Sequence, residues 1–108
     1  MSKYLLIESQ DSFSTSAVGE HVELAASLKR SGSEVTLYLL QNGVLPCRSG
    51  ADGEALHEAI AAGVEVLADD YSLRERGIAD SDLARGVKPA AIDLVVKRLA
   101  ASWKVMFL

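Results

Sequence analysis

Three short apolar runs, separated by segments with helical patterning, constrain the fold of this chain more than any other feature. The runs are residues 4–7, 35–40 and 64–68. Between the first two, apolar side chains recur from 17 to 30 at the spacing of one helix face. A strand, a helix and a strand in this order imply a right-handed crossover and a parallel strand pair. The pattern predicts a three-layer α/β sandwich with a mostly parallel sheet.

Polar caps place the starts of the first two helices. Ser14 or Thr15 is positioned to cap the helix at 17–30, and Asp52 to cap a second helix at 53–62. Basic residues in the last turn of the first helix fit its carboxyl end, where the helix dipole favours positive charge. The first two connections therefore lead from a strand into a capped helix.

The connections and the C-terminal part carry weaker signals. We expect a loop at 44–53 and an irregular segment at 79–87 that contains one helical turn. Pro89 fits the first turn of a last helix, and residues 103–108 fit a last strand. The side chains of this helix that are expected to face the core are Ile92, Val95, Val96 and Leu99.

Length and composition bound what the chain can be. Its 108 residues are enough for one domain, 1–108, and 49% of them are hydrophobic. With a net charge of −4 and no visible basic face, we expect no nucleic-acid partner. No apolar run approaches the roughly 18–20 residues of a membrane span, and the segment after Met1 lacks a signal-peptide layout. We therefore expect a cytoplasmic protein without a membrane partner.

Sequence motifs for common metals and cofactors are missing. A lone cysteine, Cys47, excludes an intrachain disulfide and a cysteine-based zinc site. The glycines match neither GxxxxGK nor GxGxxG. No histidine or carboxylate pair has the spacing of metal ligands. We expect no cofactor and no metal.

The acidic end of the third apolar run is the strongest candidate for a site. Asp69, Asp70 and Tyr71 follow the run directly, and Ser72 is placed to cap a short helix with Glu75 as its capping-box partner. In open parallel sheets, ligands bind beyond the carboxyl ends of the strands. We therefore expect a binding pocket here. The alternative is that the two carboxylates only cap the helix and face water.

Two further strand ends, and one cysteine, supply additional candidates. Asp11 follows the first strand, while Gln41 and Asn42 follow the second. Because the carboxyl ends of parallel strands share one edge of the sheet, these side chains could join the acidic pair. Cys47 is a separate candidate for a catalytic thiol, since Arg48 beside it could lower its pKa. The alternative for Cys47 is an unreactive loop thiol.

Several short segments have counterparts in a known family. They are Gln41-Asn42-Gly43-Val44, residues 66–78 closing on Arg76-Gly77-Ile78, and Gly86-Val87. With these segments and its order of elements, nearly the whole chain resembles the DsrE/DsrF-like family, which includes the sulfur-relay subunits TusD and DsrE and the YchN-like proteins. The resemblance implies a five-stranded sheet with helices on both faces. It also implies a homotrimer or homohexamer, with a pocket beside a subunit interface.

The resemblance breaks at the residue that carries the relay chemistry. Sulfur-relay members hold a persulfide on a cysteine after the third strand, but that position, eight residues before Gly77, is Asp69 here. An aspartate cannot hold a sulfane sulfur. This implies a binding or regulatory subunit related to sulfur metabolism, which binds a protein partner or a small anionic or sulfur compound.

Two alternatives stay open, and whether any reaction is catalysed is not decided by the sequence. In one, the chain is a sulfur carrier that uses Cys47 as its persulfide thiol. In the other, it is a structural assembly protein whose interface includes Trp103 and the terminal strand. The apolar character of that strand, residues 105–108, favours an oligomer in either case.

Overall fold

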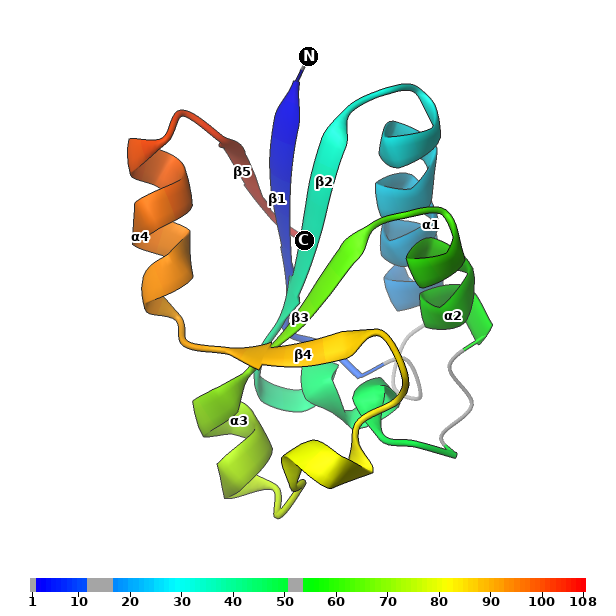
Figure 1. The fold of residues 1–108 in the computed structure, drawn as a ribbon, viewed down its shortest axis with the longest axis vertical. Coiled ribbons are helices and arrows are strands. Elements are labelled where there is room, and N and C mark those ends of the chain that lie inside the picture. Colours follow the sequence, from blue (N-terminus) through cyan, green and yellow to red (C-terminus); the bar gives the residue numbers. More distant parts are fainter. Residues whose placement is uncertain (1, 12–16, 51–53) are drawn as a thin grey trace.

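Five parallel strands form one sheet with helices on both faces (Figure 1) in the computed structural model, which describes residues 2–11, 17–50 and 54–108. The strand order is β4-β3-β2-β1-β5, and all four neighbouring pairs are parallel. The strands are β1 (Lys3–Glu8), β2 (Glu34–Leu39), β3 (Glu65–Asp69), β4 (Val87–Ala90) and β5 (Lys104–Phe107). The helices are α1 (Ala17–Arg30), α2 (Glu54–Ala61), α3 (Asp70–Glu75) and α4 (Asp93–Ala100), with two 3₁₀ segments, η1 (Gln41–Cys47) and η2 (Asp80–Asp82). The predicted fold class is confirmed.

The two faces of the sheet carry separate apolar clusters. Side chains alternate between faces along a strand, so Leu6 and Leu37 join the larger cluster with α1 and α2. Their neighbours Leu5 and Tyr38 join the smaller cluster, which packs against side chains of α4. Figure 1 shows α1 and α2 on one side of the sheet and α4 on the other. We call the second side the α4 face.

The carboxyl ends of β1 and β2 are brought together by a close backbone approach. A Cβ atom on Gly43 in η1 would lie 2.5 Å from the carbonyl oxygen of Glu8 at the end of β1. Real Cβ contacts do not reach that distance, so only glycine fits at this position. The N–H of Leu40 also donates to the Glu8 carbonyl at 3.0 Å. This edge of the sheet is therefore closely packed where the site residues lie.

The prediction that Pro89 begins the last helix was wrong. Pro89 lies in β4, paired with Ala68 of β3, and α4 begins only at Asp93. Because β4 is an edge strand, a proline without an N–H is tolerated there. The segment 79–87 had been expected to be irregular, and it holds the predicted helical turn as η2.

The predicted inner face of α4 was wrong in part. Val95 packs against the α4-face cluster as expected, but it does so beside Leu94. Three residues that were expected to face the core are more than half exposed: Ile92, Val96 and Leu99. The pattern selects a face that includes Ile92, Val96 and Leu99, but the structure turns the helix so that Leu94 and Val95 face the sheet.

Other boundaries depart from the predictions less. The expected loop at 44–53 begins as the 3₁₀ segment η1, which buries Val44 and Cys47. The predicted helix caps Ser14, Thr15 and Asp52 lie outside the described residues. Within the described ranges, no helix combines the length and apolar character needed to cross a bilayer.

Candidate functional site

The first carboxylate of the acidic pair, Asp69, is buried in a hydrogen-bond network at the end of β3. Its Oδ2 atom accepts hydrogen bonds from the Ser72 N–H at 3.1 Å and the Ser72 hydroxyl at 2.6 Å. Its Oδ1 atom accepts from the Tyr38 hydroxyl at 2.9 Å. Burial, and then the bond to Asp69, raise the pKa of Tyr38, so the phenol stays protonated and donates. Asp69 thus joins two neighbouring strands.

The predicted capping box was wrong, because α3 begins earlier than expected. Asp69 is the N-cap, and Ser72 lies inside the helix. Glu75 is the last residue of α3, where its carboxylate lies 3.8 Å from the Arg76 guanidinium. Aspartate and serine both favour the N-cap position, so the sequence alone does not decide between Asp69 and Ser72. In the structure, Asp69 takes this position.

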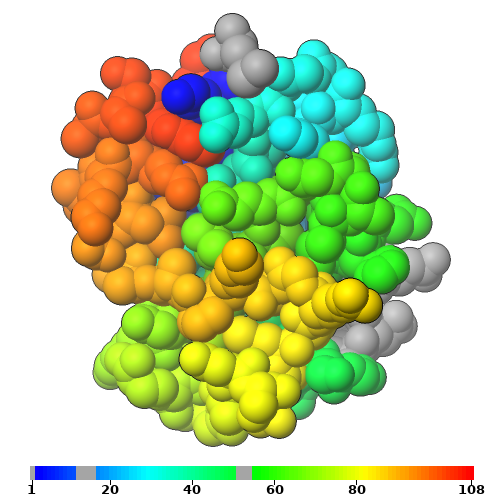
Figure 2. Space-filling view, viewed as in Figure 1, coloured from blue at the N-terminus to red at the C-terminus, as the bar shows by residue number. Residues whose placement is uncertain are grey.

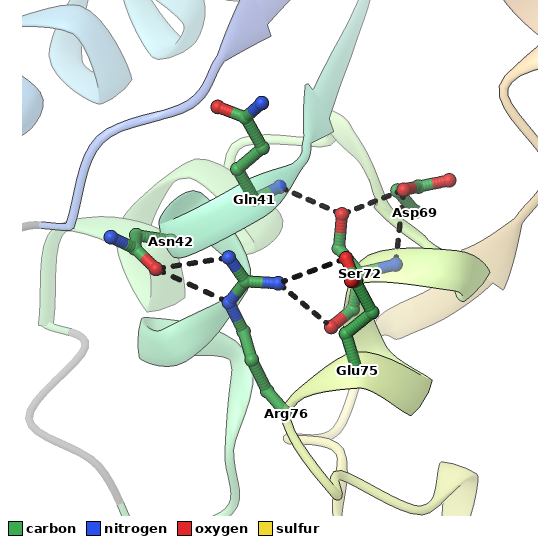
Figure 3. Close-up of polar contacts among 6 residues, drawn as sticks. All are labelled: Gln41, Asn42, Asp69, Ser72, Glu75 and Arg76. Atoms are coloured by element: carbon green, nitrogen blue, oxygen red, sulfur yellow. Dashed lines mark hydrogen bonds and ion pairs between the residues drawn. The ribbon is translucent and has the colours of Figure 1, made fainter.

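Ser72 extends the network to the end of β2. Its hydroxyl accepts a hydrogen bond from the N–H of Gln41 at 2.8 Å. Gln41 has a φ of 53°, a left-handed backbone conformation that is uncommon for a residue with a side chain. Figure 3 shows the Gln41 side chain pointing away from the network. Gln41 therefore contributes its backbone here.

Arg76 is held by contacts from two segments (Figure 3). Its Nε and Nη2 atoms donate to Asn42 Oδ1 at 3.2 and 3.0 Å. Its Nη1 atom donates to the carbonyl oxygen of Ser72 at 3.2 Å. The side chain is 24% exposed, so part of the guanidinium still meets solvent. Asn42, a predicted pocket residue, thus acts by orienting an arginine.

A hollow of about 500 Å³ opens beside this arginine, and we call it the arginine hollow. Its lining residues are Arg48, Ser49, Arg76, Gly77, Ile78, Ser81 and Asp82. Two guanidinium groups and one carboxylate give this lining a formal charge of +1. A backbone hydrogen bond connects two segments that line the hollow, because the N–H of Ser49 donates to the carbonyl oxygen of Asp82 at 2.6 Å. Two arginines and two serines in one lining suit an anionic ligand.

The sequence pointed to this hollow only indirectly. Arg76 was noted as part of a family segment, and Arg48 as a neighbour of Cys47. Their convergence depends on a tertiary contact, in which Arg48 forms an antiparallel bridge with Leu83. No spacing in the sequence reports such a bridge.

The second carboxylate, Asp70, lines a different hollow of about 400 Å³ between α3 and β4. The lining residues are Asp70, Leu73, Arg74, Ile78, Asp80, Pro89, Ala90 and Ala91. Asp70 lies 3.8 Å from Arg74 in an exposed ion pair. Tyr71 is 59% exposed, and neither Tyr71 nor Asp11 lines either hollow. Asp69 and Asp70 therefore do not share one pocket.

No acidic cluster of metal-binding type forms among the described residues. Within them, no group of three or more histidine, cysteine, aspartate or glutamate side chains is arranged to hold a metal ion. Asp69 uses both carboxylate oxygens in hydrogen bonds to protein groups. The chemistry at this edge of the sheet therefore comes from hydrogen bonds and from arginines.

Cys47 lies in the larger apolar cluster with no exposed surface. Burial raises the pKa of its thiol to about 12. The thiolate is the reactive form of cysteine, so a native thiol of this kind is a poor nucleophile at neutral pH. Arg48, beside it in the sequence, instead turns outward to the arginine hollow.

We expect Cys47 to resist thiol reagents until the chain opens. With an aromatic disulfide reagent, native protein is expected to react at an opening-limited rate that changes little from pH 7 to pH 9, since opening of the chain around the buried thiol sets that rate. Protein unfolded in urea should react at once, and faster as the pH approaches its ordinary pKa. Immediate, complete labelling of the native chain at pH 7 would contradict this assignment.

A buried glutamate that is hydrogen-bonded to a histidine, and that the sequence patterns did not reveal, lies near η1. The Glu8 side chain has no exposed surface, and its Oε2 atom accepts a hydrogen bond from His21 Nδ1 at 2.5 Å. Its Oε1 atom accepts from the N–H of Gln10 at 3.0 Å. Glu8 ends an otherwise apolar strand, and that was the only signal. His21 is 27% exposed, and its contact with Glu8 links α1 to the end of β1.

Comparisons with known proteins agree on the fold. No protein-family profile and no curated protein matches the sequence. Among solved structures, YchN from E. coli matches with 19% identity and a TM-score of 0.89, covering all of both chains. A protein of unknown function from Methanobacterium thermoautotrophicum, MTH1491, matches with 18% identity and a TM-score of 0.86, again over both whole chains.

A third solved structure has a similar fold. BT1422, a conserved protein of unknown function from Bacteroides thetaiotaomicron, matches with 16% identity and a TM-score of 0.76. The match covers 98% of this chain and 95% of that one. At such identities the likeness concerns the fold alone. The chain therefore has the α/β fold of YchN.

Proposed function

We propose that this chain is a non-catalytic DsrE-like binding protein that takes a small oxyanion, or the anionic group of a larger molecule, in the arginine hollow. The observation that carries the proposal is the convergence of Arg48 and Arg76 on one hollow from separate segments. A guanidinium group presents a planar set of donors that matches an oxyanion. A volume of about 500 Å³ falls in the range of small-molecule sites.

The positions of both arginines support binding without a large ordering cost. Arg76 is tied to Asn42 and to the Ser72 carbonyl, and Arg48 donates from Nε to the carbonyl oxygen of Leu45 at 2.9 Å. Side chains fixed before the ligand arrives lose less conformational entropy on binding. The hydroxyls of Ser49 and Ser81 can donate further hydrogen bonds to an anion.

The link to sulfur metabolism rests on the resemblance, and it suggests sulfur oxyanions as ligands. Asp69 occupies the position of the relay cysteine and is saturated with hydrogen bonds, so relay chemistry is not part of the proposal. A carrier role for Cys47 is not proposed, because that thiol is buried with a raised pKa. A cytoplasmic location and a homo-oligomeric state are included as predictions.

Calorimetric titration with thiosulfate and with inorganic phosphate tests the proposal. Arg76→Gln is expected to weaken binding by about tenfold to a hundredfold, the scale of a lost hydrogen bond to a charged group. Arg74→Gln is the matched control, since Arg74 lies on α3, two residues before Arg76, but lines the other hollow. It should change the affinity by less than about twofold, the usual size of a surface-charge effect.

A third variant separates charge from position. Asn42→Ala keeps the charge of Arg76 but removes its bidentate acceptor, so binding should weaken by a few-fold. Equal losses in Arg76→Gln and Arg74→Gln would contradict the site. Absence of binding by the wild-type chain to both anions at millimolar concentrations would contradict the proposed function itself.

A further inference from the structure

The arginine hollow holds a carboxylate as well as two guanidinium groups. Asp82, the last residue of η2, lines it together with Arg48 and Arg76. The segments that carry Arg48 and Asp82 are neighbours, because Arg48 forms its antiparallel bridge with Leu83. Figure 2 shows the segment around η2, in yellow, at the surface at the lower end of the molecule, and Asp82 is exposed. A base and an acid therefore lie in one hollow that a ligand can reach from solvent.

This acid and this base do not neutralise each other. Among the described residues, neither Arg48 nor Asp82 takes part in an ion pair. Asp82 accepts a hydrogen bond from the N–H of Ala79 at 3.3 Å with its Oδ2 atom, so its role in the turn of η2 occupies one carboxylate oxygen. Arg48 donates from Nε to the carbonyl oxygen of Leu45, and within the described ranges its two Nη atoms have no partner. Both side chains keep polar atoms for a ligand.

The charges around the hollow favour a ligand that carries both signs. Arg76 lies 3.8 Å from the carboxylate of Glu75, which offsets part of its positive charge. Together with Arg48 and Asp82, the hollow and its border then hold two bases and two acids. A free anion bound to the guanidinium groups would also meet the carboxylate of Asp82, and like charges placed close together weaken binding. A cationic group on the same ligand would turn this repulsion into an attraction.

We propose, on the basis of the function proposed above, that the ligand of the arginine hollow is a small zwitterion. Its oxyanion meets Arg48 and Arg76, and its ammonium group donates to Asp82. The ligand class is thereby narrowed from anions in general to amino acids and aminosulfonates. Hydroxyl groups of Ser49 and Ser81 in the lining fit either end of such a ligand, since a hydroxyl both donates and accepts hydrogen bonds.

Two matched sulfonates test the need for the ammonium group. Taurine and isethionate share the same chain and the same sulfonate, but taurine ends in an ammonium group and isethionate in a hydroxyl. In calorimetric titrations, the wild-type chain is expected to bind taurine at least about fivefold more tightly, the scale of a favourable ion pair at an exposed site. Arg76→Gln should weaken the binding of both ligands, because both use the sulfonate contact.

An Asp82→Asn variant tests the proposed acceptor of the ammonium group. Asparagine keeps an acceptor for the N–H of Ala79 but removes the charge, so taurine should bind about fivefold more weakly. Isethionate should bind as tightly as to wild type or more tightly, since a negative neighbour is lost. Asp80→Asn is the matched control, because Asp80 is an exposed residue of the same turn that lines the other hollow. It should change the preference for taurine by less than about twofold.

The outcomes separate this inference from the function on which it rests. If taurine binds no more tightly than isethionate, while Arg76→Gln weakens both, the zwitterion is wrong and anion binding in the hollow stands. Equal loss of the taurine preference in Asp82→Asn and Asp80→Asn would also overturn the inference, because the effect would then come from overall charge. A wild-type chain that binds neither sulfonate at millimolar concentrations would overturn both the inference and the proposed function.

Discussion

Replacing Asp69 with alanine is expected to lower the free energy of unfolding by about 3 kcal/mol, from loss of a helix cap and of buried hydrogen bonds to a carboxylate. The carboxylate accepts from the Ser72 N–H, the Ser72 hydroxyl and the Tyr38 hydroxyl, and it is 5% exposed. After its removal, the Ser72 N–H loses its side-chain acceptor. The Tyr38 hydroxyl keeps the Ala90 carbonyl at 3.2 Å, which limits the cost.

Urea unfolding followed by circular dichroism and Trp103 fluorescence measures this loss. Asp70→Ala is the matched control, because the Asp70 side chain is 40% exposed and its ion pair with Arg74 spans 3.8 Å. Its cost should stay below about 1 kcal/mol, as for surface ion pairs. Asp69→Asn should fall between the two, since asparagine is also a good N-cap residue. Equal effects of both alanine substitutions would show that Asp69 is not the structural carboxylate described above.

Replacing His21 with alanine is expected to lower the free energy of unfolding by about 2–3 kcal/mol at neutral pH, because it leaves a buried carboxylate without its partner. Glu8 has no exposed surface, and among the described residues the N–H of Gln10 is the donor to its side chain that would remain. The partial exposure of His21 lets water replace some of the lost interaction. The expected cost is therefore smaller than for a fully buried pair.

A double-mutant cycle with Glu8→Gln isolates the pair itself. Once glutamine replaces Glu8, the further loss of His21 should cost clearly less, since no buried charge is then left unpaired. His57→Ala on α2 serves as the control for removing an exposed histidine. Additive effects of Glu8→Gln and His21→Ala would contradict a direct interaction between the two side chains.

The sheet could be predicted because its strands are coded locally. Residues 4–7, 35–40 and 64–68 are apolar runs bounded by polar and glycine residues, and each became a strand of the structure. Strand β4 was missed because Val87–Ala90 has only four residues and contains Pro89. Its pairing with β3 is a long-range contact that local propensity does not encode.

The candidate site could be located from the sequence only to one edge of the sheet. Asp69 was identified by its position after a buried strand, but whether its carboxylate faced a ligand or the helix depended on where α3 begins. Asn42 was a candidate because it follows β2, and its role became visible only beside Arg76. Side chains that meet through bridges such as Arg48 to Leu83 have no signature in one sequence.

Nuclear magnetic resonance of the arginine side chains tests anion binding in the arginine hollow most directly. In a titration with thiosulfate, the Nε–Hε signals of Arg48 and Arg76 should shift together and saturate, because both guanidinium groups line the hollow. The signal of Arg30, whose guanidinium pairs with Glu23 on α1, should stay in place. Shifts that saturate at other residues while Arg48 and Arg76 remain unchanged would contradict the proposed site.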